Sequence, residues 1–191
     1  KADIKAVAID MSPSYIAAVI ENLPESTIVF DHFHVVKLLN DKLSELRREI
    51  HREAQGPLQK KVLKGTRWLL LKNSGNLNDQ KNEKQRLEEA LRLNKPLAAA
   101  YYLKEDLRQV WTQQRKSDAK TILNDWIKKA QSTGIAILQK FSKTLAAHAF
   151  GILNYYDYPI STGPLEGTNN KIKRNYRKQY GQKASCKRFR R

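Results

Sequence analysis

The N-terminal part of the chain alternates between short apolar runs and amphipathic stretches, and this order constrains the fold more than any other feature. Ile4–Ile9 is an apolar run that suits a buried strand, and Thr27–Phe30 is a second, β-branched run bounded by turn signals. Strand, helix, strand, helix in this order predicts parallel strands with helices covering them. Active-site residues of open α/β sheets collect at the carboxyl ends of the strands. Asp10 stands there after the first run and Asp31 after the second.

Turn residues and apolar periodicity predict the ends and the inward faces of the two helices in this N-terminal part. Ser12 and Pro13 predict an N-cap and a first helical residue, and Leu23 and Pro24 predict the end of that helix. The second helix is long and ends before Gly56-Pro57. Its predicted inward positions recur at helical spacing and are Val36, Leu39, Leu43, Leu46 and Ile50.

Residues 58–154 show helical periodicity and no convincing strand. Asn73–Asn78 and Gly134 predict breaks, Pro96 opens a helix, and Ser117 is a candidate N-cap. The predicted inward positions are Leu87, Ala90, Leu91, Leu97, Tyr101, Leu107, Trp111, Ile122, Trp126, Ile127, Ala130, Leu138, Phe141, Leu145 and Ile152. We therefore predict a helix-dominated α/β chain with three parts: strand–helix units at 1–57, an all-helical insertion at 58–154, and a last helix with a basic tail at 155–191.

The stretch Ser161–Lys173 places one carboxylate, Glu166, between a Gly-Pro turn and a strongly basic segment. A helix starting near Pro164 would align Glu166, Asn169, Asn170 and Lys173 on one face. Such a stripe suits a metal ion held beside a phosphate chain, because carboxylates bind the cation while amides and lysine contact phosphate oxygens. On spacing alone a solvated polar face is the better interpretation. The charge of the region instead favours a metal and phosphate site, because Gly167–Arg191 contains ten Lys or Arg residues and no acid.

The net charge of the whole chain is +17, which indicates a polyanionic partner, most simply nucleic acid. Cys186 is the single cysteine and excludes an internal disulfide or a multi-cysteine zinc site. No stretch approaches the ~20 apolar residues of a membrane span. The chain begins at Lys1 without a methionine, so we expect it to be part of a longer protein.

Four segments together resemble the bacterial insertion-sequence DDE transposases of the ISL-three group, and the resemblance extends from residue 1 to about 181. These segments are Val7–Tyr15, Phe30–Val35, Tyr101–Asp106 and Tyr155–Lys173. The last segment is the longest and most specific. After Gly181 the chain departs from the family, because residues 182–191 are basic and polar where the family continues with an apolar helix; we expect a truncation or an altered reading frame there.

The resemblance implies a partial RNase H-like fold, the second half of its sheet, interrupted by the helical insertion. Asp10 and Glu166 would be the second and third acids of the catalytic triad and ligands of two Mg²⁺ or Mn²⁺ ions in the intact enzyme. The first acid and the family's DNA-binding parts would lie upstream. The implied partner is DNA, both the element ends and the target, and a homodimer is a further possibility. We expect no membrane partner and a location in the bacterial cytoplasm. The expected DNA contacts are Asn169, Asn170, Lys171, Lys173, Arg174, Arg177 and Lys178.

Other interpretations of the sequence stay open. The chain could be a non-enzymatic basic module that binds nucleic acid, or an RNase H-like nuclease. Asp31 is a candidate third acid or only a turn cap, and His32 and His34 either touch a metal or a scissile phosphate or pack near a strand end. Two tryptophans, Trp111 and Trp126, either stack on a base or belong to the core, and core is the commoner role at helical spacing. Asp157 and the tyrosines of Tyr155–Tyr158 either shape a DNA channel or form a packed linker.

Overall fold

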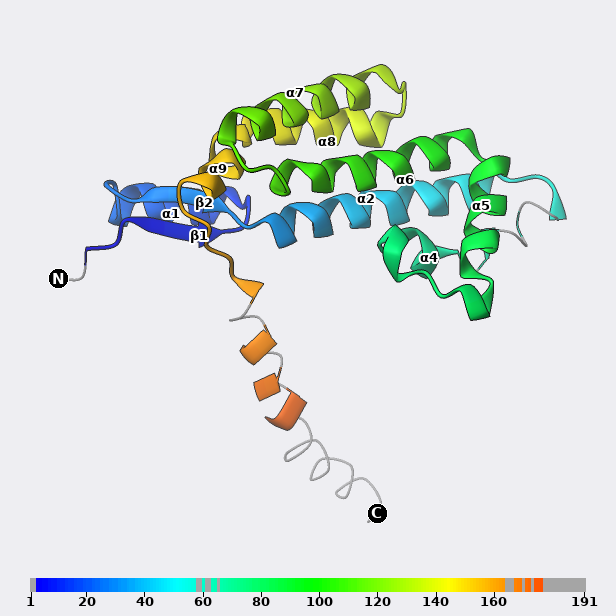
Figure 1. The fold of residues 1–191 in the computed structure, drawn as a ribbon, viewed down its shortest axis with the longest axis horizontal. Coiled ribbons are helices and arrows are strands. Elements are labelled where there is room, and N and C mark those ends of the chain that lie inside the picture. Colours follow the sequence, from blue (N-terminus) through cyan, green and yellow to red (C-terminus); the bar gives the residue numbers. More distant parts are fainter. Residues whose placement is uncertain are drawn as a thin grey trace, which may run out of the picture.

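The computed structural model describes residues 3–57, 60, 63–64, 66–163, 167–169, 171–172 and 174–176. The molecule is elongated, with a small sheet at one end and helices running away from it toward a second group of helices at the other end (Figure 1). No helix of the described residues is long and apolar enough to cross a membrane.

The two predicted strands form one parallel pair. Strand β1 (Ala6–Ile9) pairs with β2 (Thr27–Phe30) in a register that sets Ile9 opposite Phe30. Helix α1 (Pro13–Asn22) connects them, with Pro13 at its first turn as expected, although Ser12 makes no side-chain capping bond. Val29 and Phe30 are fully buried. The sequence prediction of a parallel α/β unit is therefore confirmed.

Helix α2 (His32–Glu53) begins directly after β2 and runs along the length of the molecule (Figure 1). Asp31 is its N-cap, accepting a hydrogen bond from Phe33 N at 3.0 Å. The prediction that Val36 faces the core was wrong. The cap sets the helix so that Val35 is buried instead, together with Leu39, Leu43 and Leu46 at helical spacing.

The described residues of 58–154 form helices and connecting loops and contain no strand. The elements of this insertion are α4 (Arg67–Leu71), η1 (Ser74–Asn76), η2 (Asp79–Lys81), α5 (Glu83–Leu93), α6 (Lys95–Arg108), η3 (Gln109–Trp111), α7 (Lys116–Ser132), α8 (Ala136–Ala147), α9 (Ala149–Leu153) and η4 (Asn154–Tyr156). Helices α4, α6 and α8 pack against α2. One continuous hydrophobic core joins the strands to the insertion.

Two boundaries in the insertion differ from prediction, and one agrees. Arg115, rather than Ser117, occupies the N-cap position of α7: its carbonyl accepts the backbone N–H groups of Asp118 and Ala119, and its side chain pairs with Asp118 without capping the helix. The helical segment after the predicted break at Gly134 is divided into two helices at His148, whose ring centroid lies 5.2 Å from that of Phe30. Gly134 separates α7 from α8, as predicted, and has a positive φ of 69°.

Lys104 fixes α4 to α6 from a buried position. Its side chain is 1% exposed, and its ammonium donates to the carbonyls of Leu70 at 2.9 Å and Lys72 at 2.6 Å at the end of α4. Glu105 lies 2.7 Å away and compensates its charge. Burial lowers the pKa of Lys104, an effect that Glu105 opposes. The lysine thus acts as a structural cross-link between two helices.

The end of the insertion returns to the sheet. Helix α9 and η4 pack against β2, where Gly151 lies so close to Phe30 that an added Cβ would come within 2.4 Å of the ring. Asn154 donates its side-chain amide to the carbonyl of Ile28 at 3.0 Å. Segments more than a hundred positions apart in sequence therefore meet at one strand.

Candidate functional site

The carboxyl ends of the two strands bring two aspartates to one edge. Asp10 follows Ile9 and Asp31 follows Phe30, and these strand residues are partners in the register. The backbone N–H of Asp31 also donates to the carbonyl of Ile9 at 3.0 Å, which extends the pairing past the strands. Parallel strands place such residues side by side, so sequence position alone located this edge.

Asp10 is half-buried and only partly satisfied by hydrogen bonds. Its Oδ1 accepts from Ser12 N at 2.9 Å, and Oδ2 accepts no hydrogen bond from any described residue. A hollow of about 290 Å³ adjoins it, lined by Asp10, Met11, Ser12, His34, Lys37, Leu38, Asp41 and Thr144. The carboxylate is thus available to a ligand from outside the described chain.

The hollow carries donors of the type that Mg²⁺ and Mn²⁺ prefer. Asp10 contributes an oxygen that accepts no hydrogen bond from the described residues, and Asp41 borders the same space from α2. Among the described residues there is no cluster of three or more potential metal-ligating side chains. The residues present therefore fit part of a metal site, and further ligands would have to come from elsewhere.

Asp41 and Lys37 were missed by sequence reasoning. Both lie on α2 with His34, at spacings of three and four residues, and this places all three on one helix face. That spacing is visible in the sequence. What the sequence does not show is that this face of α2 lies beside the end of β1.

Asp31 is fully buried and serves as an anchor. Besides capping α2, its carboxylate accepts from Ser161 Oγ at 3.1 Å, from Thr162 N at 3.0 Å and from the Thr162 hydroxyl. Burial by itself would raise the pKa of Asp31, but the hydrogen bonds from Thr162, Phe33 and Ser161 outweigh burial and lower that pKa. Because these donors occupy both carboxylate oxygens, Asp31 is placed as a turn cap and anchor and not as a third metal ligand. We call the contact of Asp31 with Ser161 and Thr162 the Asp31 clasp.

The Asp31 clasp fixes the beginning of the Ser161–Lys173 motif at the edge that carries Asp10. Glu166 lies outside the described residues, as do Asn170, Lys173, Arg177 and Lys178. Glu166 follows Thr162 by four residues, a span of at most about 14 Å even in a fully extended chain. Described residues of the predicted helix are helical, and Asn169, Lys171 and Arg174 are exposed. The structure thus places Ser161 and Thr162 at the start of the motif and does not describe Glu166.

The aromatic residues near this edge form a packed linker. The ring centroid of His32 lies 5.9 Å from that of Trp111 and 5.8 Å from that of Tyr155. The Nδ1 of His32 is 3.5 Å from Oδ1 of Asp31. Asp157 pairs with Lys116, and the Tyr156 hydroxyl donates to the carbonyl of Val110. Burial raises the pKa of Tyr156. These contacts favour the structural interpretation of His32 and of the tyrosine-rich segment.

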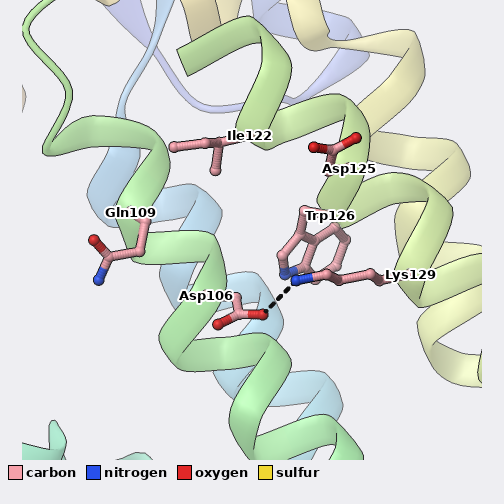
Figure 2. Close-up of a pocket in the computed structure, with 6 residues that line it drawn as sticks. All are labelled: Asp106, Gln109, Ile122, Asp125, Trp126 and Lys129. Atoms are coloured by element: carbon pink, nitrogen blue, oxygen red, sulfur yellow. Dashed lines mark hydrogen bonds and ion pairs between the residues drawn. The ribbon is translucent and has the colours of Figure 1, made fainter. Parts of the chain in front are cut away.

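Trp126 belongs to the core. Its ring is 1% exposed, packs edge-on against Phe141 at 5.7 Å, and donates its indole N–H to the carbonyl of Leu103 at 2.6 Å. It is one of the residues that line a hollow of about 220 Å³ between α6 and α7, and Figure 2 shows it beside the ion pair of Asp106 with Lys129. A buried indole with its donor already used is not placed to stack on a base.

Comparison with known proteins gives the family. A family model named for DDE transposases of the ISL3 type, and described as "Transposase", matches residues 1–191. The chain is 37% identical over 180 residues to the transposase for insertion sequence element IS1001 of Bordetella parapertussis, covering 93% of this chain and 44% of that protein. It is 27% identical over 194 residues to the transposase for IS1557 of Mycobacterium tuberculosis, covering 90% of this chain and 43% of that protein.

The chain therefore spans less than half the length of these curated relatives. No solved structure matches it. The family match extends over every residue and includes the sheet edge, the Asp31 clasp and the insertion. This chain belongs to the ISL3-type family of insertion-sequence transposases.

Proposed function

We propose that this chain supplies the catalytic part of a DDE transposase that cuts DNA at the ends of an insertion sequence and joins the freed 3′-OH to target DNA. The observation that carries the proposal is the Asp31 clasp. It holds the start of the Glu166 motif against the end of β2, next to the strand end that presents Asp10. Two carboxylates 156 positions apart in sequence would then serve one site.

The parallel strand pair and the late acid are consistent with a partial RNase H-like fold, which we propose for the catalytic part. Asp10 and Glu166 would hold two Mg²⁺ or Mn²⁺ ions. Bound divalent ions supply activation of the attacking oxygen and stabilisation of the leaving oxygen in an in-line displacement at phosphorus. Asp10 suits this role because Ser12 N fixes its Oδ1 while Oδ2 accepts no hydrogen bond from the described residues.

Other residues of the chain would hold the DNA. Lys37 borders the hollow beside Asp10, where its ammonium can contact a phosphate oxygen. Lys173 would contact the scissile region, and Asn169 and Asn170 would orient the strand. The exposed Lys171 and Arg174, with Arg177 and Lys178, would neutralise backbone phosphates.

The relatives are more than twice as long as this chain, and the resemblance implies a triad of acids, of which Asp10 and Glu166 would be the second and third. We therefore propose strand cleavage and transfer for the intact enzyme and expect none from these 191 residues alone.

The test compares the intact transposase with its Asp10→Asn and Glu166→Gln variants on a labelled element end, with Asp125→Asn as the matched control. Asp125 is an exposed aspartate of α7 and does not line the hollow beside Asp10.

We expect both site variants to fall to background in cleavage and joining while the Asp125 variant keeps its activity. An active Asp10→Asn enzyme would overturn the proposal. Cleavage without joining in the parent enzyme would indicate a nuclease, and DNA binding without either reaction would indicate a non-enzymatic module.

A further inference from the structure

A large hollow of about 770 Å³ lies between the C-terminal half of α2 and the start of α4, at the other end of α2 from the sheet. Basic side chains dominate its lining. We call it the basic groove and define it by the residues that line it: Glu45, Arg47, Arg48, Glu49, His51, Arg52, Lys64, Arg67 and Trp68. Glu45 already pairs with Lys42 at 3.0 Å, so its charge is partly compensated.

The cations of the basic groove are crowded. The side chain of Arg47 donates to the carbonyl of Leu63 at 3.2 Å through Nη1, whereas its buried Nε has no hydrogen-bond partner among the described residues. Burial lowers the pKa of Arg47, and the nearby charges of Arg67 and Arg48 lower it further. Like charges that act on one another in this way repel, so an anion in the groove would relieve the repulsion.

Trp68 gives the basic groove an aromatic wall. Its side chain is 65% exposed, unlike the core tryptophan Trp126, and the guanidinium carbon of Arg67 lies 5.0 Å from its ring. An exposed indole beside several arginines is a combination typical of surfaces that bind nucleic acid, where cations contact phosphates and aromatic rings contact sugars or bases.

The basic groove is aligned with the Asp10 hollow along α2. His34, Lys37 and Asp41 line the hollow, and Glu45, Arg48 and Arg52 line the groove. Successive members of this series are three or four residues apart, so all lie on one face of the helix. From His34 to Arg52 the helix rises roughly 27 Å at 1.5 Å per residue. That is about eight base pairs of duplex at 3.4 Å each.

We propose that the basic groove binds the phosphate backbone of duplex DNA, through Arg48, Arg52, Lys64 and Arg67, as a contact separate from the basic C-terminal segment. That this duplex is the same DNA that reacts at Asp10 rests on the proposed function. Binding of the duplex in the basic groove does not rest on it, because this contact needs neither the metal ions nor the catalytic acids.

The test measures DNA binding by the whole 191-residue chain as a function of salt. Fluorescence anisotropy with a labelled duplex of about 24 base pairs, which exceeds the ~27 Å span, gives log K against log salt between about 50 and 200 mM, without divalent ions. The groove variant carries Arg48→Ala, Arg52→Ala and Arg67→Ala, all at exposed positions. The control variant carries Lys128→Ala, Lys140→Ala and Lys143→Ala, which removes the same charge from exposed positions on α7 and α8.

Each lost phosphate contact reduces the magnitude of the slope by about 0.9, so the groove variant should lose about 2.7 and bind on the order of a hundredfold more weakly at about 0.1 M salt. The control variant should keep most of the parent slope. A third variant with lysine at the three groove positions should recover the slope, since lysine binds phosphate as a point charge. Circular dichroism verifies that the variants are folded.

Equal slopes for the groove and control variants, with both folded, would overturn the proposal and leave net charge as the only effect. Failure of the lysine variant to recover the slope would also count against phosphate binding. Either result leaves the catalytic assignment of Asp10 and Glu166 unchanged. Conversely, an active Asp10 variant would overturn that assignment and leave DNA binding by the basic groove unchanged.

Discussion

Replacement of Asp31 by asparagine should release the Asp31 clasp. The carboxylate accepts hydrogen bonds from two backbone N–H groups and two hydroxyls in a fully buried position. Asparagine offers one acceptor oxygen and turns an NH₂ group toward donors. Hydrogen bonds to a charged group contribute roughly 1.5–3 kcal/mol each, and an unsatisfied buried donor costs about 1–3 kcal/mol. Because the hydroxyls can rotate to other partners, we expect the two N–H groups to dominate, with a loss of about 3–5 kcal/mol in the free energy of unfolding.

Urea unfolding followed by circular dichroism measures that loss, and amide hydrogen exchange locates it. The Thr162 amide donates to Asp31, so its protection should fall in the variant before that of the core helices. Asp157→Asn is the matched control: it removes a half-exposed acid paired with Lys116, which should cost no more than about 1 kcal/mol. Unchanged protection at Thr162, or equal losses for the two variants, would refute the reasoning.

The same variant should show a defined pH dependence. The folded pKa of Asp31 is lowered from its ordinary value, so its contribution to stability is present above the unfolded pKa and is lost as pH falls through the folded pKa. The stability difference between the parent and Asp31→Asn should therefore be constant near neutrality and shrink below about pH 4. A difference that persists unchanged to about pH 2 would show that the carboxylate charge contributes nothing.

Three further results are expected. Gly151→Ala should destabilise the chain by about 1–3 kcal/mol in urea unfolding, because the new Cβ would come within 2.4 Å of the Phe30 ring; an unchanged midpoint would contradict the close packing. Lys104→Met should lower the free energy of unfolding by roughly 2–4 kcal/mol, since it leaves the carbonyls of Leu70 and Lys72 without their buried donor, and a neutral result would show that water replaces it. Mn²⁺ titrated into the chain should bind more weakly after Asp10→Asn, as measured by electron paramagnetic resonance of the free ion, and equal binding would remove Asp10 from the ligand set.

Local chemistry determined much of the fold from sequence alone. The apolar runs of β1 and β2, the proline at the start of α1 and the glycine at 134 each act within a few residues, so they could be interpreted without knowing what packs around them. The burial of Leu138 and Leu145 was predicted for the same reason, because helical spacing decides which side of a helix is apolar. The position of Asp10 at a strand end also followed from sequence.

Tertiary structure decided the roles of side chains whose partners are distant in the chain. Asp31 could be predicted as a helix cap, but its contacts with Ser161 and Thr162 bridge 130 residues or more. Lys104 is charged and would be assigned to the surface until the end of α4 is placed against it. The basic groove likewise exists only because packing brings Arg67 to the face of α2 that carries Arg48. Sequence periodicity records which face of an element is apolar, whereas the partner that covers or extends that face is selected by the packing of the whole chain.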